Sequence, residues 1–138
     1  MKNIVSYISE SLFSKEVFVV LKPGSLDLAQ TIIERFEKDG WKIVQTTTKT
    51  LLLQEAKELY KVHKKEPFYE DLCNYMSSGP CRAFIFRNPD SEKPFTEVKV
   101  IKEEIRNEYG ESDMRNVLHS SDSRKAMEHE ASIFFTLT

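Results

Sequence analysis

One histidine of this chain, His119, is surrounded by side chains of the kinds that support a reactive nucleophile. Asn116 precedes it, and Ser121 and Asp122 follow it, so an amide, a hydroxyl and a carboxylate lie close by in the sequence. Imidazole is a usable nucleophile and is largely neutral near pH 7, so a ring nitrogen can attack a phosphoryl group. The sequence therefore predicts nucleophilic chemistry at His119, against the alternative of a capping or surface histidine.

His119 lies in a short sequence block at 115–123, and two other short blocks accompany it. They are Val-Val-Leu-Lys-Pro at 19–23 and Tyr-Met-Ser-Ser-Gly-Pro at 75–80. In order and spacing the three blocks resemble the nucleoside diphosphate kinase family, over about residues 17–135. The resemblance implies a nucleoside diphosphate kinase that moves the γ-phosphoryl of a nucleoside triphosphate to a nucleoside diphosphate, by a ping-pong reaction through phospho-His119.

The resemblance also implies catalytic roles for two residues that follow the histidine. Glu130 matches a glutamate that accepts a hydrogen bond from one ring nitrogen, which fixes the tautomer and leaves the other nitrogen free to attack. Ser121 matches a hydroxyl that helps this glutamate to hold the histidine. Without the resemblance, Glu130 would be interpreted as a solvated helix residue and Ser121 as a helix N-cap.

A nucleotide-binding cleft follows from the same resemblance. Lys22 and Asn116 correspond to residues that contact the sugar hydroxyl, and Phe68 corresponds to a side chain that stacks on the base, whichever base it is. Arg106 matches an arginine that clamps phosphates with its planar, permanently charged fork. Mg²⁺ would be held mainly by the nucleotide phosphates, so no metal-binding motif is expected. The expected nucleotide-binding residues are Lys22, Tyr60, Phe68, Leu72, Arg106 and Asn116.

The chain departs from the family pattern before Arg106, where it is short and lacks a recognisable Pro-Gly-Thr-Ile-Arg run. The family takes a second phosphate arginine and a threonine from this region. Ser120 stands where a glycine normally follows the histidine, so a conformation favoured by glycine would be strained there. The alternative function is a degenerate domain that binds nucleotide or a protein partner with little or no phosphotransfer. Spacing alone does not choose among four substitutes for the missing groups: Lys93, Thr96, Lys99 and Lys102.

Strands and helices alternate along the sequence that must position these residues. Val, Ile, Thr and Phe content predicts strands at 16–21, 41–50, 81–86 and 133–135, the first of them buried on both faces. Apolar residues at helical spacing predict helices over 25–39 and 53–63 and through 72–76. Residues 95–107 also have helical spacing, although Val98 and Val100 permit a strand. Ser121 or Asp122 is expected to cap a last helix through 126–128.

This alternation predicts a two-layer α/β or α+β sandwich. The resemblance specifies an α+β fold with a ferredoxin-like four-stranded antiparallel sheet and helices over one face. Residues 16–138 are expected to form the kinase-like domain, and residues 1–15 an N-terminal extension. At 138 residues the chain is long enough for one hydrophobic core.

Composition and charge limit the partners and the location. The chain has 20 Lys and Arg against 22 Asp and Glu, a net charge of -2, so no strong field favours nucleic acid or an anionic membrane. Two cysteines are too few for a disulfide framework, and no signal peptide or membrane span is recognisable, so a cytoplasmic location is expected. The long loop of the family packs around the trimer axis of hexamers. Its shortening here predicts a homo-oligomer in which a dimer is favoured over a hexamer.

Overall fold

The computed structural model of this protein describes residues 15–135. The predicted N-terminal extension lies outside these residues, except for Lys15, as do the last three residues of the chain. Within the described range no helix has both the length and the apolar character that a membrane-spanning segment needs.

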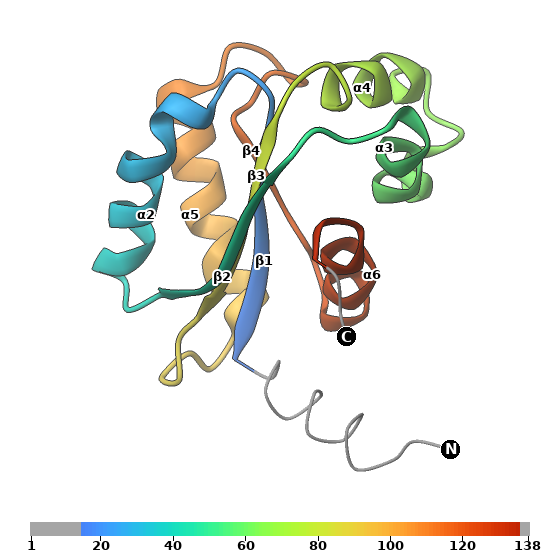
Figure 1. Ribbon diagram of the computed structural model, residues 1–138. Coiled ribbons are helices and arrows are strands. Elements are labelled where there is room, and N and C mark those ends of the chain that lie inside the picture. The colour runs from blue at the N-terminus through green and yellow to red at the C-terminus, as the bar shows by residue number, and fades with distance from the viewer. Residues whose placement is uncertain (1–14, 136–138) are drawn as a thin grey trace, which may run out of the picture.

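Four antiparallel strands form one sheet in the order β2-β3-β1-β4 (Figure 1). β1 lies inside the sheet, where β3 pairs with its full length and the short β4 pairs with its last residues. The two edge strands of the sheet are β2 and β4. The predicted four-stranded antiparallel sheet is therefore confirmed. The strands are β1 (Glu16–Leu21), β2 (Lys42–Lys49), β3 (Cys81–Arg87) and β4 (Leu118–Ser120).

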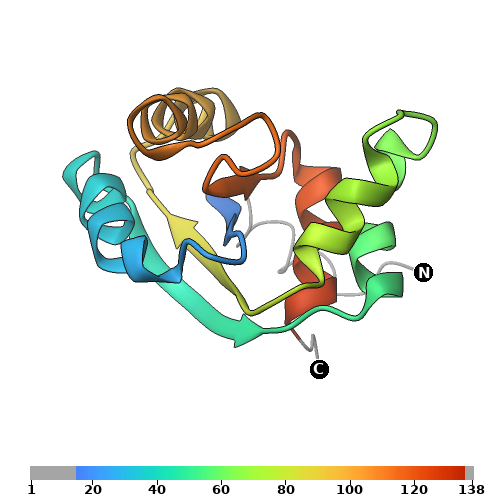
Figure 2. The ribbon, with the colours of Figure 1, turned by 90° about the horizontal axis from the view of Figure 1, so that it is seen from above.

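Helices cover both faces of this sheet, as Figures 1 and 2 show. The expectation of helices over one face, in two layers, is wrong in this respect. Every residue of β1 is buried, and alternate side chains of a strand point to opposite faces, so each face needs its own apolar cover. α2 (Ala29–Lys38) and α5 (Pro94–Tyr109) cover one face. α3 (Leu53–Leu59), α4 (Tyr69–Met76) and α6 (Arg124–Phe134) cover the other.

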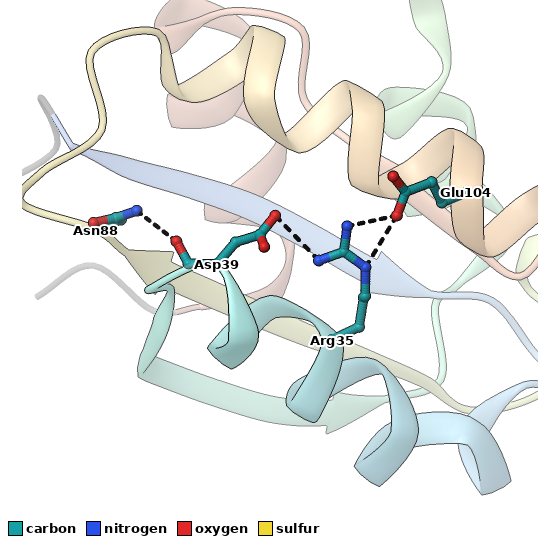
Figure 3. A network of polar contacts seen from close by, with 4 residues as sticks. All are labelled: Arg35, Asp39, Asn88 and Glu104. Atoms are coloured by element: carbon teal, nitrogen blue, oxygen red, sulfur yellow. Dashed lines mark hydrogen bonds and ion pairs between the residues drawn. The ribbon is translucent and has the colours of Figure 1, made fainter.

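The face under α2 and α5 is closed by aromatic packing and by an ion-pair network. Phe36 of α2 stacks on Phe86 of β3 with ring centroids 4.4 Å apart, and Trp41 is fully buried beside them. At the surface Arg35 of α2 reaches Glu104 of α5, with 3.0 Å between Nε and Oε2 (Figure 3). This layer is a packed structural support for the sheet.

The helices predicted from periodicity are present, with small changes at their ends. The helix expected over 25–39 consists of a 3₁₀ turn, η1 (Leu26–Leu28), followed by α2, and Gly40 ends it with a positive φ of 94°. The helix expected over 53–63 is α3 followed by a second 3₁₀ turn, η2 (Lys61–His63). The ambiguous segment 95–107 is helix α5, which begins at Pro94.

The end of the chain differs from the prediction in three ways. The strand predicted at 133–135 is wrong, because α6 continues to Phe134 with buried residues at the helical spacing of Met127, Glu130 and Phe134. The fourth strand is instead β4, which contains His119 and is only three residues long. The cap of α6 is Ser123, rather than Ser121 or Asp122, and its Oγ accepts a hydrogen bond from the Ala126 amide at 3.1 Å.

Candidate active site

A cavity of about 500 Å³ opens above the ends of β1 and β4, between α5 and the segment that contains η2 and α4. The structure brings together residues from widely separated parts of the chain here, and His119 is one of them. All six predicted nucleotide-binding residues also line this cavity: Lys22, Tyr60, Phe68, Leu72, Arg106 and Asn116.

His119 is the middle residue of β4, where it pairs with Val20 of the central strand. Its Nε2 contacts Oε1 of Glu130, which lies on the buried face of α6. The contact engages one ring nitrogen and leaves Nδ1 as the nitrogen available for attack. The edge of the buried Tyr60 ring packs against the imidazole, with centroids 5.4 Å apart and planes at 74°. The ring is therefore held by two residues from separate parts of the chain, Glu130 on α6 and Tyr60 between α3 and η2.

The turn before β4 is backbone-strained. Val117 has a φ of 81°, a value that a β-branched residue rarely adopts, and no other non-glycine residue within 15–135 has a positive φ. The Val117 carbonyl accepts a hydrogen bond from the Lys22 amide at 2.8 Å, which ties this turn to the end of β1. Strain of this kind costs roughly 1–3 kcal/mol and commonly occurs at functional sites. Ser120 has an ordinary negative φ in β4, so the concern about its replacement of glycine is removed.

Lys22 is a buried lysine at the end of β1, with 3% of its surface exposed. Its Nζ donates to Oδ1 of Asn116 at 2.7 Å and to the carbonyl of Met114 at 3.1 Å. Burial, together with repulsion from Arg106 and Lys102, lowers the pKa of this amine to about 7. Lys22 and Asn116, which were each predicted to contact the sugar hydroxyl, are thus hydrogen-bonded to each other, and both line the cavity.

Arg106 places a guanidinium next to the nucleophile. It lies on α5, and its Nη2 donates to the carbonyl of Leu118 at 2.8 Å, directly before His119. Burial lowers the pKa of the arginine, and its buried Nε has no hydrogen-bond partner among residues 15–135. Its ion pair with Glu103 is long, at 3.9 Å, so no carboxylate of the described chain neutralises the guanidinium at close range.

An aromatic cluster forms the opposite side of the cavity. Tyr60 and Leu72 are buried, whereas Phe68 is 43% exposed and presents its ring at the rim. Burial raises the pKa of the Tyr60 hydroxyl, which therefore stays protonated at neutral pH. The geometry fits a flat ligand against Phe68 while charged groups lie deeper in the cavity.

His63 also lines the cavity, and no role was predicted for it from the sequence. Its ring lies 5.5 Å from that of Phe68 and 6.4 Å from that of Tyr60. The sequence signal was weak, because His63 lies within a run of charged residues at the end of the helix predicted over 53–63, and in the structure it is solvent-exposed in the η2 turn.

Ser121 is the predicted catalytic residue that the structure places least favourably. It is buried directly after β4, and its Oγ has no hydrogen-bond partner within the described chain. The expected contact between this hydroxyl and Glu130 is not formed. Its backbone amide donates to the carbonyl of Phe18 at 3.2 Å, so Ser121 continues the pairing of β4 with β1.

Comparison with known proteins adds independent evidence. The family model described as nucleoside diphosphate kinase matches residues 15–138. The nucleoside diphosphate kinase of Hyperthermus butylicus is 36% identical over 88% of this chain and 92% of its own, and that of Kosmotoga olearia is 34% identical over 88% of each. The solved nucleoside diphosphate kinase of Aquifex aeolicus superposes with a TM-score of 0.76 at 27% identity, covering 88% and 95% of the two chains. This chain therefore belongs to the nucleoside diphosphate kinase family.

Proposed function

We propose that this protein is a nucleoside diphosphate kinase that forms a phosphohistidine at Nδ1 of His119. The observation that carries the proposal is the contact between Nε2 of this histidine and Glu130, at the edge of a cavity lined by cationic side chains. A carboxylate on Nε2 fixes the tautomer in which Nε2 carries the proton and Nδ1 has the lone pair. Family membership and the named relatives support the same activity.

The reaction divides into two similar halves. In the first half the Nδ1 lone pair attacks the γ-phosphorus, the N–P bond forms, and the bond to the β,γ-bridging oxygen breaks to release a nucleoside diphosphate. Positive charge grows on the imidazole during this step, and the buried Glu130 carboxylate stabilises it. In the second half a terminal oxygen of another nucleoside diphosphate attacks the phosphorus of the phosphohistidine, a P–O bond forms, and the N–P bond breaks, which returns the lone pair to Nδ1.

The cavity residues bind and orient the nucleotide for this transfer. We assign the sugar hydroxyl to Lys22 and Asn116, whose side chains are already hydrogen-bonded to each other. Arg106 neutralises phosphoryl oxygens beside His119, and Phe68 stacks on the base. Stacking at an exposed rim does not read base edges, so we expect broad tolerance of the base.

The donor set of the cavity fits a magnesium ion that is bound mainly by the substrate. Within residues 15–135 no group of three or more His, Cys, Asp or Glu side chains is arranged to hold a metal. One carboxylate of the cavity wall, Asp122, can supply a ligand directly or through water, as is usual for Mg²⁺ on nucleotide phosphates. When bound, the ion would supply charge neutralisation at the phosphates.

We further propose that the protein is cytoplasmic and a homodimer rather than a hexamer. The short loop before α5, together with the exposed edge strand β2, supports a reduced assembly. Ile43 and Val44 on β2 are 38% and 53% exposed, an apolar edge that pairing with a second copy would cover. Light scattering should give the mass of a dimer, and a hexameric mass would contradict this assignment.

The test of the proposed activity is intact mass spectrometry after brief incubation with Mg²⁺ and ATP, followed by addition of GDP. The expected result is a gain of one phosphoryl group, which disappears on GDP addition as GTP forms. The His119→Ala variant should bind ADP but never gain the phosphoryl group.

A normal gain in His119→Ala would contradict the role of His119. Absence of the gain in the unmodified protein, with ADP binding shown by calorimetry, would favour the alternative of a nucleotide-binding domain without phosphotransfer.

A further inference from the structure

The segment before Arg106 is where the chain departs from the family pattern, and the structure distinguishes the four candidate substitutes there. Lys93, Thr96 and Lys99 are all solvent-exposed, and none of them lines the cavity of the active site. Lys102 is buried, with 7% of its surface exposed, and it does line this cavity. Helix α5 therefore places one additional cation, Lys102, in the wall of the candidate active-site cavity.

Helical geometry explains why Lys102 is the one that points inward. Residues four apart on an α-helix lie on the same face, and Lys102 precedes Arg106 by one such step. Arg106 is anchored beside the nucleophile by its hydrogen bond to the carbonyl of Leu118. Lys102 consequently faces the same cavity one turn earlier along α5, whereas Lys99 lies on the solvent side of the helix.

The charge around Lys102 is not balanced by the protein. Within the described residues its amine makes no ion pair within 4.0 Å, and the carboxylates of Asp122 and Glu103 act on it only from a distance. Lys22 and Arg106 share the cavity with it, so three cations face a space that Asp113 and Asp122 alone line with negative charge. Burying an unpaired ammonium is unfavourable, and burial with the nearby Arg106 lowers its pKa. A phosphate-bearing ligand would complete this arrangement.

We propose that Lys102 is the second phosphate-binding cation of this active site, so that one helix, α5, supplies both phosphate-binding charges through Lys102 and Arg106. The inference rests on the proposed kinase function. The Lys102 amine contacts the phosphate chain of the nucleotide and neutralises the charge that develops on the oxygens of the transferred group. A lysine acts as a compact point charge, so it replaces the charge of an arginine but not its two-pronged hydrogen bonding.

The first test compares Lys102→Met with Lys99→Met in single-turnover phosphoenzyme formation with Mg²⁺ and ATP. Both variants remove one lysine charge from α5, but only Lys102 faces the cavity. The expected result is a rate lower by about 10²- to 10³-fold in Lys102→Met, as when one donor to a developing anion is removed, and an unchanged rate in Lys99→Met. The melting temperature of Lys102→Met should be equal or higher, since the variant removes a buried unpaired charge.

An unchanged rate in Lys102→Met, or an equal fall in both variants, would overturn the proposal. A second measurement needs no variant. Lysine labelling by acetic anhydride, located by mass spectrometry, should show that ADP protects Lys102 whereas adenosine does not, and that Lys99 is labelled equally in all samples. Labelling of Lys102 that ADP leaves unchanged would also overturn the proposal. Failure of the unmodified protein to form a phosphoenzyme would instead refute the kinase function, and the labelling result would still decide whether Lys102 binds phosphate.

Discussion

Two sides of helix α5 show contrasting uses of positive charge. On the side that faces α2, Arg35 meets Glu104 of α5 and also Asp39, whose Oδ2 lies 3.1 Å from Nη1 (Figure 3). On the side that faces β4, Lys102 and Arg106 line the candidate active site without a close carboxylate partner. Two carboxylates of the protein compensate the charge of Arg35, whereas among residues 15–135 Lys102 and Arg106 have no carboxylate closer than 3.9 Å.

The contrast separates a cation that the protein compensates from cations that we propose bind a ligand. Arg35 is compensated by two carboxylates near the surface, and such exposed pairs contribute little to stability. Arg106 and Lys102 are half-buried or buried, so leaving them uncompensated costs stability that a bound anion recovers. Both kinds of side chain look alike in the sequence, where they are charged residues spaced along amphipathic helices.

The largest effect should come from removing the active-site guanidinium. In Arg106→Met the rate of phosphoenzyme formation should fall by about 10²- to 10³-fold, because charge neutralisation beside His119 is lost. Stopped quench-flow with ATP measures this rate, and circular dichroism confirms the fold. Arg35→Met is the matched control, with an expected wild-type rate. An equal fall in rate in the two variants would contradict the proposed difference between the two sides of α5.

The next effect should come from Glu130, the carboxylate that we propose orients His119. Glu130→Gln keeps the shape of the side chain but removes the charge, and its amide can donate to Nε2 and so favour the wrong tautomer. We expect a loss of about tenfold to hundredfold in rate, the range seen when partners of metal-binding histidines are removed. Quench-flow measures the rate, and Glu128→Gln, an exposed position on the same helix, is the control. An unchanged rate in Glu130→Gln would show that this carboxylate has no orienting role.

The pH dependence of the free energy of unfolding should show that the charged form of Lys22 destabilises the folded protein. Its pKa is about 7 in the folded protein, against 10.5 for an ordinary lysine, so between these values the unfolded chain binds the proton that the folded chain has lost. The free energy of unfolding must then rise with pH from 7 to 10.5, and the penalty is complete below pH 7. Urea unfolding across this range should show a smaller rise in Lys22→Met. Equal pH profiles would exclude the lowered pKa, and saturating ADP should flatten the wild-type profile by keeping the amine charged.

The smallest effect should come from the satisfied arginine. Arg35→Met should lower the free energy of unfolding by roughly 0.5–1 kcal/mol, because partly exposed ion pairs contribute only that much. The effect should shrink in high salt, since screening weakens surface pairs. Urea titration at low and high ionic strength measures both values. A larger loss that is insensitive to salt would show that Arg35 acts through packing on α2 and α5.

Much of this molecule could be predicted from local patterns. The burial of β1 on both faces and the helix α2 were predicted because each depends on neighbours within a few residues. The spacing at 95–107 permitted either a helix or a strand, and the structure shows that it is helix α5. The predicted cavity residues were found by their resemblance to family motifs, and the structure places all six nucleotide-binding candidates around one space. The two misassigned regions were β4 and the end of α6. β4 has only three residues, and the end of α6 has only a pair of aromatic residues, so neither shows enough periodicity to be recognised.

Residue type and local spacing fix which side chains are available and predict most of the helices and strands, although not β4 or the helical end of α6. Only the tertiary structure shows which of these side chains lie together and which are compensated. Pairing of β4 with the central strand places His119 against Glu130 of α6, and the register of α5 turns Lys102 inward while Lys99 stays in solvent. Burial and charge compensation depend on contacts between residues far apart in the chain, so no local pattern could separate Arg106, which lacks a close partner, from Arg35, which has two.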